Sequence, residues 1–312
     1  MSIWVELLLF VIGLVLIVKG GDLFVDAASW IAEVSGIPKF IVGATIVSLA
    51  TTMPEMIVSV MAAVEGKVDM AVGNAVGSVT ANTALIFAIA VLFMTVELTR
   101  RQYLTKSVIL IASSAVVLLA SLTGQFQFWG TIVLFLLFFA FIFENVKQAK
   151  LEMHDAEKPE FSGKELAKNI AMFVFGAAGI VVGSRLLVDS GSAIAAYLGV
   201  PESIIAVTLV AVGTSLPELV TTITSIIKKQ SSLSAGNIIG ANIIDLCLIL
   251  PLCDLVSAEK LPISHQSIVL DMPACLLVVV TCVLPMLLRQ KSSKVQGAVL
   301  LVLYIGYLIV LI

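Results

Sequence analysis

Two short acidic segments, each broken by a proline, carry the residue types that bind cations. Residues 51–55 read Thr-Thr-Met-Pro-Glu and residues 214–218 read Thr-Ser-Leu-Pro-Glu, each inside an apolar stretch. Threonine and glutamate four positions apart share one face of a helix. The proline has no N–H and crowds the carbonyl four residues back, so a hydroxyl, a carboxylate and freed carbonyls gather at one level. The candidate residues are Thr51, Pro54 and Glu55, with their counterparts Thr214, Pro217 and Glu218.

A second pair of segments adds polar residues beside small ones. Residues 73–77 and 236–240 both read Gly-Asn-x-x-Gly, and each is followed by a polar residue, Asn82 or Asp245. Small residues four apart let helices approach closely, so we expect this packing to bring Asn82 and Asp245 towards the two glutamates. The expected packing residues are Gly73, Gly77, Gly236 and Gly240.

Together these segments predict an all-oxygen site with up to three carboxylates, Glu55, Glu218 and Asp245. Ca²⁺ takes six to eight oxygen ligands, whereas Mg²⁺ demands a tighter octahedron and gives up its waters reluctantly. No Cys or His joins the segments, which argues against zinc or copper. We therefore expect a hard cation, with a divalent ion best matching the clustered charge. We expect no cofactor, no enzymatic activity and no nucleic-acid partner.

The composition places these segments in a membrane. Of the 312 residues, 60% are hydrophobic and only 12% are charged, about half the charge of a soluble domain. Apolar stretches of membrane-spanning length recur along the chain. The sequence predicts an all-α polytopic protein with ten spans, at residues 2–34, 38–64, 70–96, 107–124, 128–146, 168–198, 202–227, 233–256, 267–288 and 295–312. Carboxylates at this depth are costly and indicate function.

The basic residues predict the orientation, because Lys and Arg in short connections mark the cytoplasm. Only Lys67 and Lys260 fall on one side of the ten spans. The other side receives Lys39, Arg100, Arg101, Lys106, Lys147, Lys150, Lys158, Lys164, Lys168, Lys228, Lys229, Arg289, Lys291 and Lys294. We expect a multi-pass cell-membrane protein with both termini outside and a cytoplasmic central linker.

The chain also repeats itself at an offset of 163 residues. Gly36 and Pro38 align with Gly199 and Pro201, and both acidic segments and both Gly-Asn segments align at the same offset. We expect a first five-helix repeat over residues 1–147, a linker over 148–168 and a second repeat over 169–312. Five spans is an odd number, so the second repeat enters the membrane inverted. Inverted repeats are typical of transporters, whose substrate lies near the midplane on interrupted helices.

These paired segments resemble the α-repeats of the calcium:cation antiporter superfamily, and they are most similar to those of prokaryotic sodium/calcium exchangers. The resemblance implies ten helices, with spans 2, 3, 7 and 8 forming the ion-binding core. It also implies Na⁺/Ca²⁺ exchange by alternating access, in which the long first and sixth helices slide across that core. The lipid bilayer, Ca²⁺ and Na⁺ are the implied partners, and we expect a monomer.

The resemblance also implies residue roles. Glu55, Glu218, Thr51 and Thr214 would bind Ca²⁺, while Asn82 and Asp245 would line the central position. The implied Na⁺ ligands are Thr52, Ser78, Ser215, the carbonyls of Ser48 and Ala211, and the two glutamates. Ala241 stands where the family usually has Ser, which puts one Na⁺ position in doubt, and Ala50 and Thr52 replace the Gly and Ser of the second repeat.

Other functions stay open at this point. Desolvation favours protonated carboxylates, so H⁺/Ca²⁺ exchange is the first alternative. Asp245 resembles the acid of potassium-dependent relatives, which makes K⁺ a second candidate counter-ion. A cation channel would lack counter-transport, and an intramembrane protease would need Asp26 or Asp189 for catalysis.

Overall fold

A computed structural model describes residues 2–155, 161–199, 213–257 and 261–311 of the chain. Apart from two isolated β-bridges, the regular structure in these ranges is helical. The described part of the chain contains eight helices long and apolar enough to cross a membrane, or nine if one bent pair forms a single span. The predicted all-α membrane class is therefore confirmed. The seventh predicted span, 202–227, falls only partly within the described residues, which contain its second part as α12 (Leu216–Ile227).

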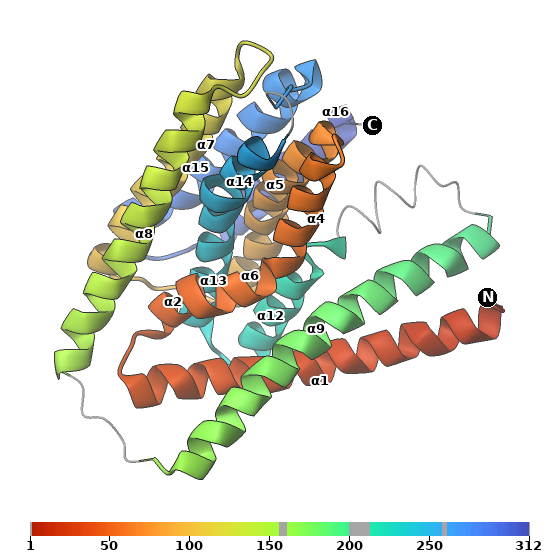
Figure 1. Cartoon of the computed structure of the whole chain (residues 1–312). Helices are drawn as coiled ribbons and strands as arrows, with labels where there is room; N and C mark the ends of the chain where they lie inside the picture. The colour runs from red at the N-terminus through yellow and green to blue at the C-terminus, as the bar shows by residue number, and fades with distance from the viewer. Residues whose placement is uncertain (1, 156–160, 200–212, 258–260, 312) are drawn as a thin grey trace.

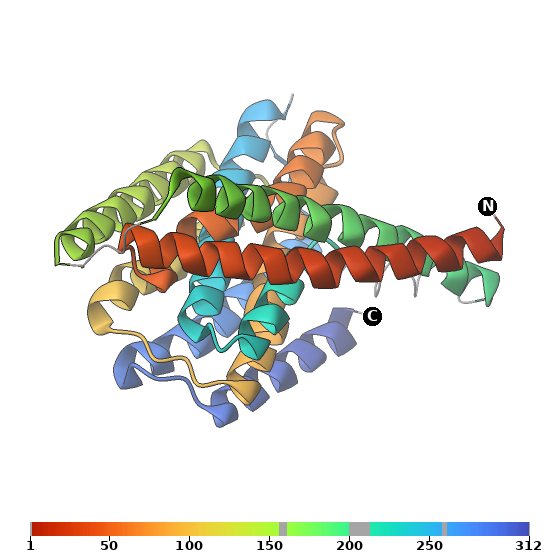
Figure 2. The same ribbon diagram turned by 90° about the horizontal axis from the view of Figure 1, so that it is seen from below.

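Two unusually long helices lie side by side across the rest of the molecule. They are α1 (Ile3–Ser35) and α9 (Gly163–Tyr197), and they cross the other helices at a steep angle (Figures 1 and 2). Their contact is lined by glycines. A methyl group on Gly20 would lie 2.8 Å from the Ile180 nitrogen, and one on Gly183 would lie 2.8 Å from the Gly13 carbonyl oxygen. Small residues thus allow the two backbones to touch.

The core beside this pair contains three interrupted spans and the described part of the seventh predicted span. In the first half they comprise α2 (Lys39–Val42), η1 (Gly43–Val47), α3 (Ser48–Thr51) and α4 (Met53–Val64), then α5 (Val68–Ala81), η2 (Asn82–Phe87) and α6 (Ala88–Phe93). In the second half they comprise α12, then α13 (Ser231–Ile244), η4 (Asp245–Ile249) and α14 (Leu250–Val256). The η segments are π-helical turns, which occur frequently at functional sites.

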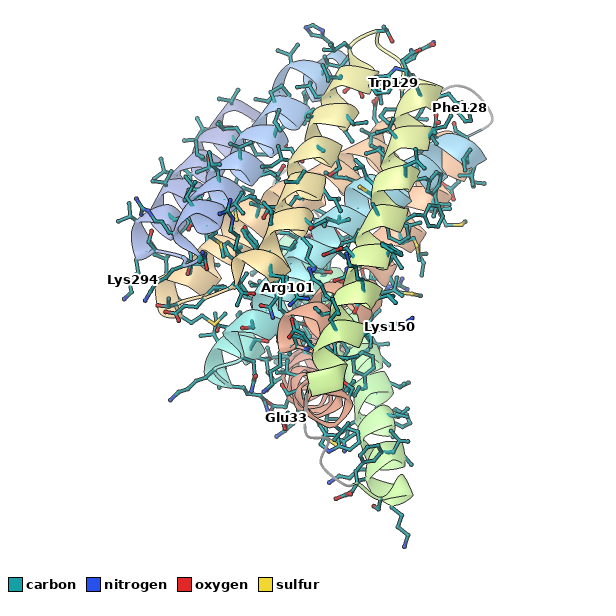
Figure 3. The ribbon with its side chains drawn as sticks, turned by 90° about the vertical axis from the view of Figure 1, so that its left-hand side faces the viewer. Glu33, Arg101, Phe128, Trp129, Lys150 and Lys294 are labelled. Carbon is teal, nitrogen blue, oxygen red and sulfur yellow. The ribbon has the colours of Figure 1, made fainter. Side chains whose placement is uncertain are left out.

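The remaining helices flank the core on the side away from α1 and α9 (Figure 1). They are α7 (Arg100–Ser121), α8 (Phe128–Asp155), η5 (Ser267–Asp271) with α15 (Met272–Arg289), and α16 (Lys294–Leu311). Figure 3 shows α8 running down from the top of the view, with Phe128 at its upper end and Lys150 near its lower end.

The linker predicted at residues 148–168 is mostly helical in the described residues. Helix α8 continues to Asp155, because Gln148 is anchored to the Arg101 carbonyl and to Glu144 at 2.9 and 2.8 Å. Helix α9 already begins at Gly163, where Ser162 and Glu165 form a reciprocal capping box. On both sides of residues 156–160, the described parts of this segment are therefore largely the ends of two helices.

Candidate ion site

The second span is broken at its Thr-Thr-Met-Pro-Glu segment. The axis bends by 48° between Lys39–Thr51 and Met53–Val64. Thr52 at the bend has φ −84° and ψ −2°. Ser215, its repeat partner, has nearly the same conformation, with φ −85° and ψ 6°. A proline follows each bend and donates no hydrogen bond, so Pro54 and Pro217 place the same turn in both halves.

Close backbone packing brings the broken second span against α13. A methyl group on Gly236 would lie 3.0 Å from the Ala44 nitrogen, and one on Gly240 would lie 2.5 Å from the Ser48 hydroxyl. At the offset of 163 residues, the counterparts of Phe40, Ala44 and Ser48 are residues 203, 207 and 211, which lie outside the described residues. Gly236 and Gly240 therefore hold a tight crossing beside Ser48, and the packing role of Gly73 and Gly77 stays a prediction.

Two asparagines connect the halves in a crosswise pattern. The Thr51 hydroxyl donates to the Asn237 side-chain oxygen at 3.1 Å, and the Thr214 hydroxyl donates to that of Asn74 at 3.3 Å. Asn74 also donates to the Glu55 carbonyl at 3.3 Å. Each threonine of one acidic segment is thus held by the Gly-Asn segment of the other half.

The Ser48 carbonyl is a second gathering point. It accepts hydrogen bonds from Thr52 at 2.7 Å and from Thr51 at 3.3 Å. The Thr52 hydroxyl also lies 3.3 Å from one carboxylate oxygen of Glu218. The Ser48 carbonyl and the Thr52 hydroxyl, both expected ligands from the second span, therefore lie close to Glu218 of the seventh span.

The three carboxylates are buried and poorly satisfied. Glu55 is 1% exposed, and Glu218 and Asp245 are fully buried. Among the described residues, both side-chain oxygens of Glu55, both of Asp245 and one of Glu218 have no hydrogen-bond partner. A buried polar atom without a partner costs free energy and calls for an explanation. Five such oxygens, with Glu218 already within hydrogen-bond reach of Thr52 on the second span, fit a bound cation.

The other predicted residues lie around this centre. Asn82 and Asp245 each begin a π-helical turn, η2 or η4, and the Asn82 side-chain oxygen is also buried without a partner. Ser78 and Ser215 are buried, and the Ser215 hydroxyl has no partner. Ala241 is fully buried. Its methyl side chain provides no hydroxyl at the position where the family usually has Ser. Ala211 lies outside the described residues.

Sequence reasoning did not select Asn74 and Asn237 as site residues. Their signal was present, because both follow the first glycine of the repeated Gly-Asn-x-x-Gly segments. The glycines were interpreted as packing residues, and the asparagines beside them were not assigned a role. The structure shows that these side chains position Thr51 and Thr214.

The carboxylates alone do not form a complete metal cage. In the part of the chain that the structure describes, no group of three or more His, Cys, Asp and Glu side chains is close enough to hold a metal ion. A cation here would need hydroxyl and carbonyl oxygens as well, which Thr51, Thr52 and the Ser48 carbonyl offer. Such a mixed oxygen set suits a hard cation.

An all-helical membrane protein with paired broken helices around buried carboxylates has the architecture of a secondary transporter. Comparison with known families agrees. Residues 5–146 and 168–312 match the model of the sodium/calcium exchanger protein family. The chain therefore belongs to this family, which confirms the resemblance to the calcium:cation antiporters.

Individual relatives extend over the whole chain. It is 29% identical to the sodium/calcium exchanger MaX1 of Methanosarcina acetivorans, covering 99% of both chains. It is 33% identical to the putative antiporter CaxA of Alkalimonas amylolytica, covering 95% of both. A solved structure of the sodium-calcium exchanger NCX_Mj, soaked with 10 mM Na⁺ and 10 mM Sr²⁺, matches with a TM-score of 0.85 at 25% identity, covering 97% of both chains. The protein is thus a cation/Ca²⁺ exchanger by family and fold.

Proposed function

We propose that this protein is a secondary antiporter that exchanges Na⁺ for Ca²⁺ by alternating access and has no enzymatic activity. The observation that carries the proposal is the set of buried carboxylate oxygens on Glu55, Glu218 and Asp245 that have no hydrogen-bond partner among the described residues. Family membership supports the same substrate class.

In this proposal Glu55 and Glu218 bind Ca²⁺ through their carboxylates, with oxygens from Thr51 and Thr214. The Na⁺ ligands are Thr52, Ser78, Ser215, the carbonyls of Ser48 and Ala211, and the same two glutamates. Asn82 and Asp245 line the centre, where Asp245 can take up a proton. The shared glutamates are the important feature, because Ca²⁺ and Na⁺ must then compete for one site.

That competition supplies the coupling. Buried carboxylates without a cation are costly, so the empty core does not cross easily and each crossing needs one cargo or the other. Na⁺ moving down its gradient then drives Ca²⁺ the opposite way. If three Na⁺ exchange for one Ca²⁺, one net charge moves, worth about 2.3 kcal/mol per 100 mV of membrane potential. We therefore expect a voltage-sensitive exchange.

The proposed arrangement in the membrane is ten spans in two inverted repeats, residues 1–147 and 169–312, joined by residues 148–168. Both termini lie outside and the joining segment lies in the cytoplasm. The protein works as a monomer, because all the proposed ligands come from one chain. The basic residues support the orientation through the positive-inside rule.

The test is Ca²⁺ uptake into vesicles containing the purified protein. Vesicles loaded with Na⁺ are diluted into Na⁺-free medium with ⁴⁵Ca²⁺, and Glu55→Gln and Glu218→Gln are compared with Glu97→Gln. Glu97 is a matched control because it pairs with Lys291 at 2.8 Å on the surface. We expect uptake that requires internal Na⁺, is lost in both core variants and is kept in Glu97→Gln.

Two further conditions separate the alternatives. Uptake driven by an imposed pH gradient without Na⁺ would show H⁺/Ca²⁺ exchange. Uptake that also requires K⁺ outside the vesicles, on the same side as Ca²⁺, would show a K⁺-dependent exchanger. Ca²⁺ flux with no counter-ion on either side would refute the antiport proposal in favour of a channel.

A further inference from the structure

An ion pair joins the long helix α1 to the end of a core helix. Lys228, the residue after α12, lies 2.7 Å from a carboxylate oxygen of Asp26 and 3.5 Å from one of Asp22. The two aspartates are four positions apart, so they share one face of α1. One lysine on the core thus contacts two acids on the neighbouring long helix.

The helices are tightly packed just beside this ion pair. A methyl group on Gly21 would lie 2.7 Å from the Thr224 hydroxyl and 3.1 Å from a Val220 methyl. The contact between α1 and the second half of α12 is therefore closed. The ion pair lies at the outer end of that closed contact.

The repeat supplies a counterpart in which the charges are exchanged. At the offset of 163 residues, Asp22 aligns with Arg185 on α9, and Lys228 aligns with Glu65 at the end of α4. For this pair, an acid on the long helix and a base on the core become a base on the long helix and an acid on the core. Asp26 aligns with Asp189 and keeps its charge, so Arg185 is the residue on α9 whose charge is opposite to that of Glu65.

The counterpart contact is in a different register. Ser184 aligns with Gly21, yet it lines a cavity of about 130 Å³ together with Pro54 and Val58. The residues aligned with Val220 and Thr224 are Ile57 and Met61, about three positions further along α4. Ser184 of α9 thus faces a cavity, whereas Gly21 of α1 faces packed side chains of its core helix.

In this register Arg185 lines the same cavity near the start of α4, while Glu65 pairs with Lys67 at 2.7 Å. The structure therefore shows α1 paired with the end of its core helix, whereas Arg185 of α9 lies beside a cavity near the start of α4 and Glu65 pairs with another residue. Because the halves are inverted repeats, exchanging their registers would open the Lys228 end and close the Glu65 end.

We propose that Lys228 with Asp22 and Asp26, and Arg185 with Glu65, form two alternating ion-pair latches. Each holds a long helix at one end of its movement, and only one is closed at a time. These are positioning residues: they set which side of the membrane the ion site faces and do not contact the ions. The inference rests on the proposed alternating access.

The size of the expected effect follows from the solvent exposure of the paired side chains. Asp22 and Asp26 are about half exposed and Lys228 is 23% exposed, so each latch is screened by water and salt. Removing one should change the ratio of the two conformations by about two- to five-fold, the range that a single exposed ion pair supports. The two latches should act in opposite directions.

Electron-paramagnetic distance measurements in lipid vesicles test this directly. Spin labels are placed at Glu33→Cys on α1 and Phe128→Cys on α8, which lie at opposite ends of the molecule in Figure 3. The four native cysteines are buried. Lys228→Gln, Glu65→Gln and the charge swap Asp26→Lys with Lys228→Asp are compared in low and high salt. Lys291→Gln, which removes the Glu97 ion pair away from both long helices, is the control.

We expect Lys228→Gln to increase the conformation in which α1 has moved away, and Glu65→Gln to decrease it. The charge swap should restore the parent ratio, high salt should shrink all the differences, and Lys291→Gln should change nothing. Shifts of the same sign, or none, would overturn the latch. Distances that respond to Na⁺ and Ca²⁺ but not to the variants would refute the latch alone, whereas distances insensitive to both ions would count against the proposed exchange.

Discussion

Adding one methyl group at Gly240 should disturb the ion site without removing any proposed ligand atom. The methyl of Gly240→Ala would lie 2.5 Å from the Ser48 hydroxyl, and atoms this close must separate to at least 3.0 Å. The backbone of Ala44 lies on the same side at 2.7 Å from the methyl. The second span must therefore move by about half an ångström or more, carrying Ser48 and Thr51 with it.

The cost can be worked from two opposing effects. Overpacking costs about 1–3 kcal/mol, and contact with backbone at Ala44 favours the upper end. Replacing glycine by alanine within a helix stabilises the helix by about 1 kcal/mol. The native arrangement of the site is therefore destabilised by about 2 kcal/mol. This corresponds to about a thirtyfold change in the equilibrium constant between the native arrangement and the displaced one.

The assay is ⁴⁵Ca²⁺ uptake into Na⁺-loaded vesicles, together with thermal unfolding in detergent. We expect Gly240→Ala to unfold at a lower temperature and to need at least tenfold more Ca²⁺ for half-maximal uptake. Gly306→Ala is the control, because a methyl at Gly306 on α16 would meet no described atom within 4 Å. Gly240→Ala behaving like Gly306→Ala would refute the argument that this crossing positions the site.

Two other contacts give predictions of different kinds. Asn74→Ala and Asn237→Ala each remove the hydrogen-bond partner of a site threonine. Each should raise the half-saturating Ca²⁺ concentration about three- to tenfold, the effect of losing one hydrogen bond. An unchanged half-saturating concentration in vesicle uptake would contradict their positioning role. Lys106→Met should instead lower the unfolding temperature, because Lys106 is fully buried and donates a hydrogen bond to Gln148 at 3.0 Å. It should leave Na⁺/Ca²⁺ selectivity intact, because Lys106 is far from any proposed ligand in sequence. Altered selectivity in competition assays would contradict this prediction.

Much of the fold was predictable because the signals are local. Apolar length indicates spans, and a proline after Thr52 or Ser215 determines where a helix must break. The same applies to Glu55 and Glu218, since an acid inside an apolar stretch has few structural explanations. These features need no knowledge of the neighbouring helices.

Other features depend on contacts that the sequence does not display. The π-helical turns that begin at Asn82 and Asp245 have ordinary helical composition. The crosswise bonds of Asn74 and Asn237 require both halves to be in place. The different registers of α1 and α9 are the clearest case, because two repeats with the same signature give no local reason to differ. That asymmetry belongs to the conformation of the whole molecule.

The central claim is that Glu55 and Glu218 share one divalent cation, and crystals soaked in Sr²⁺ test it most directly. Strontium is a heavier ion of calcium's charge, and its anomalous scattering locates it without assumptions about ligands. We predict one strong peak between the two carboxylates, at about the Ca²⁺–oxygen distance of 2.3–2.6 Å from each or slightly beyond, which Na⁺ displaces. A peak bound by neither glutamate, in a crystal that takes up Sr²⁺, would contradict the account.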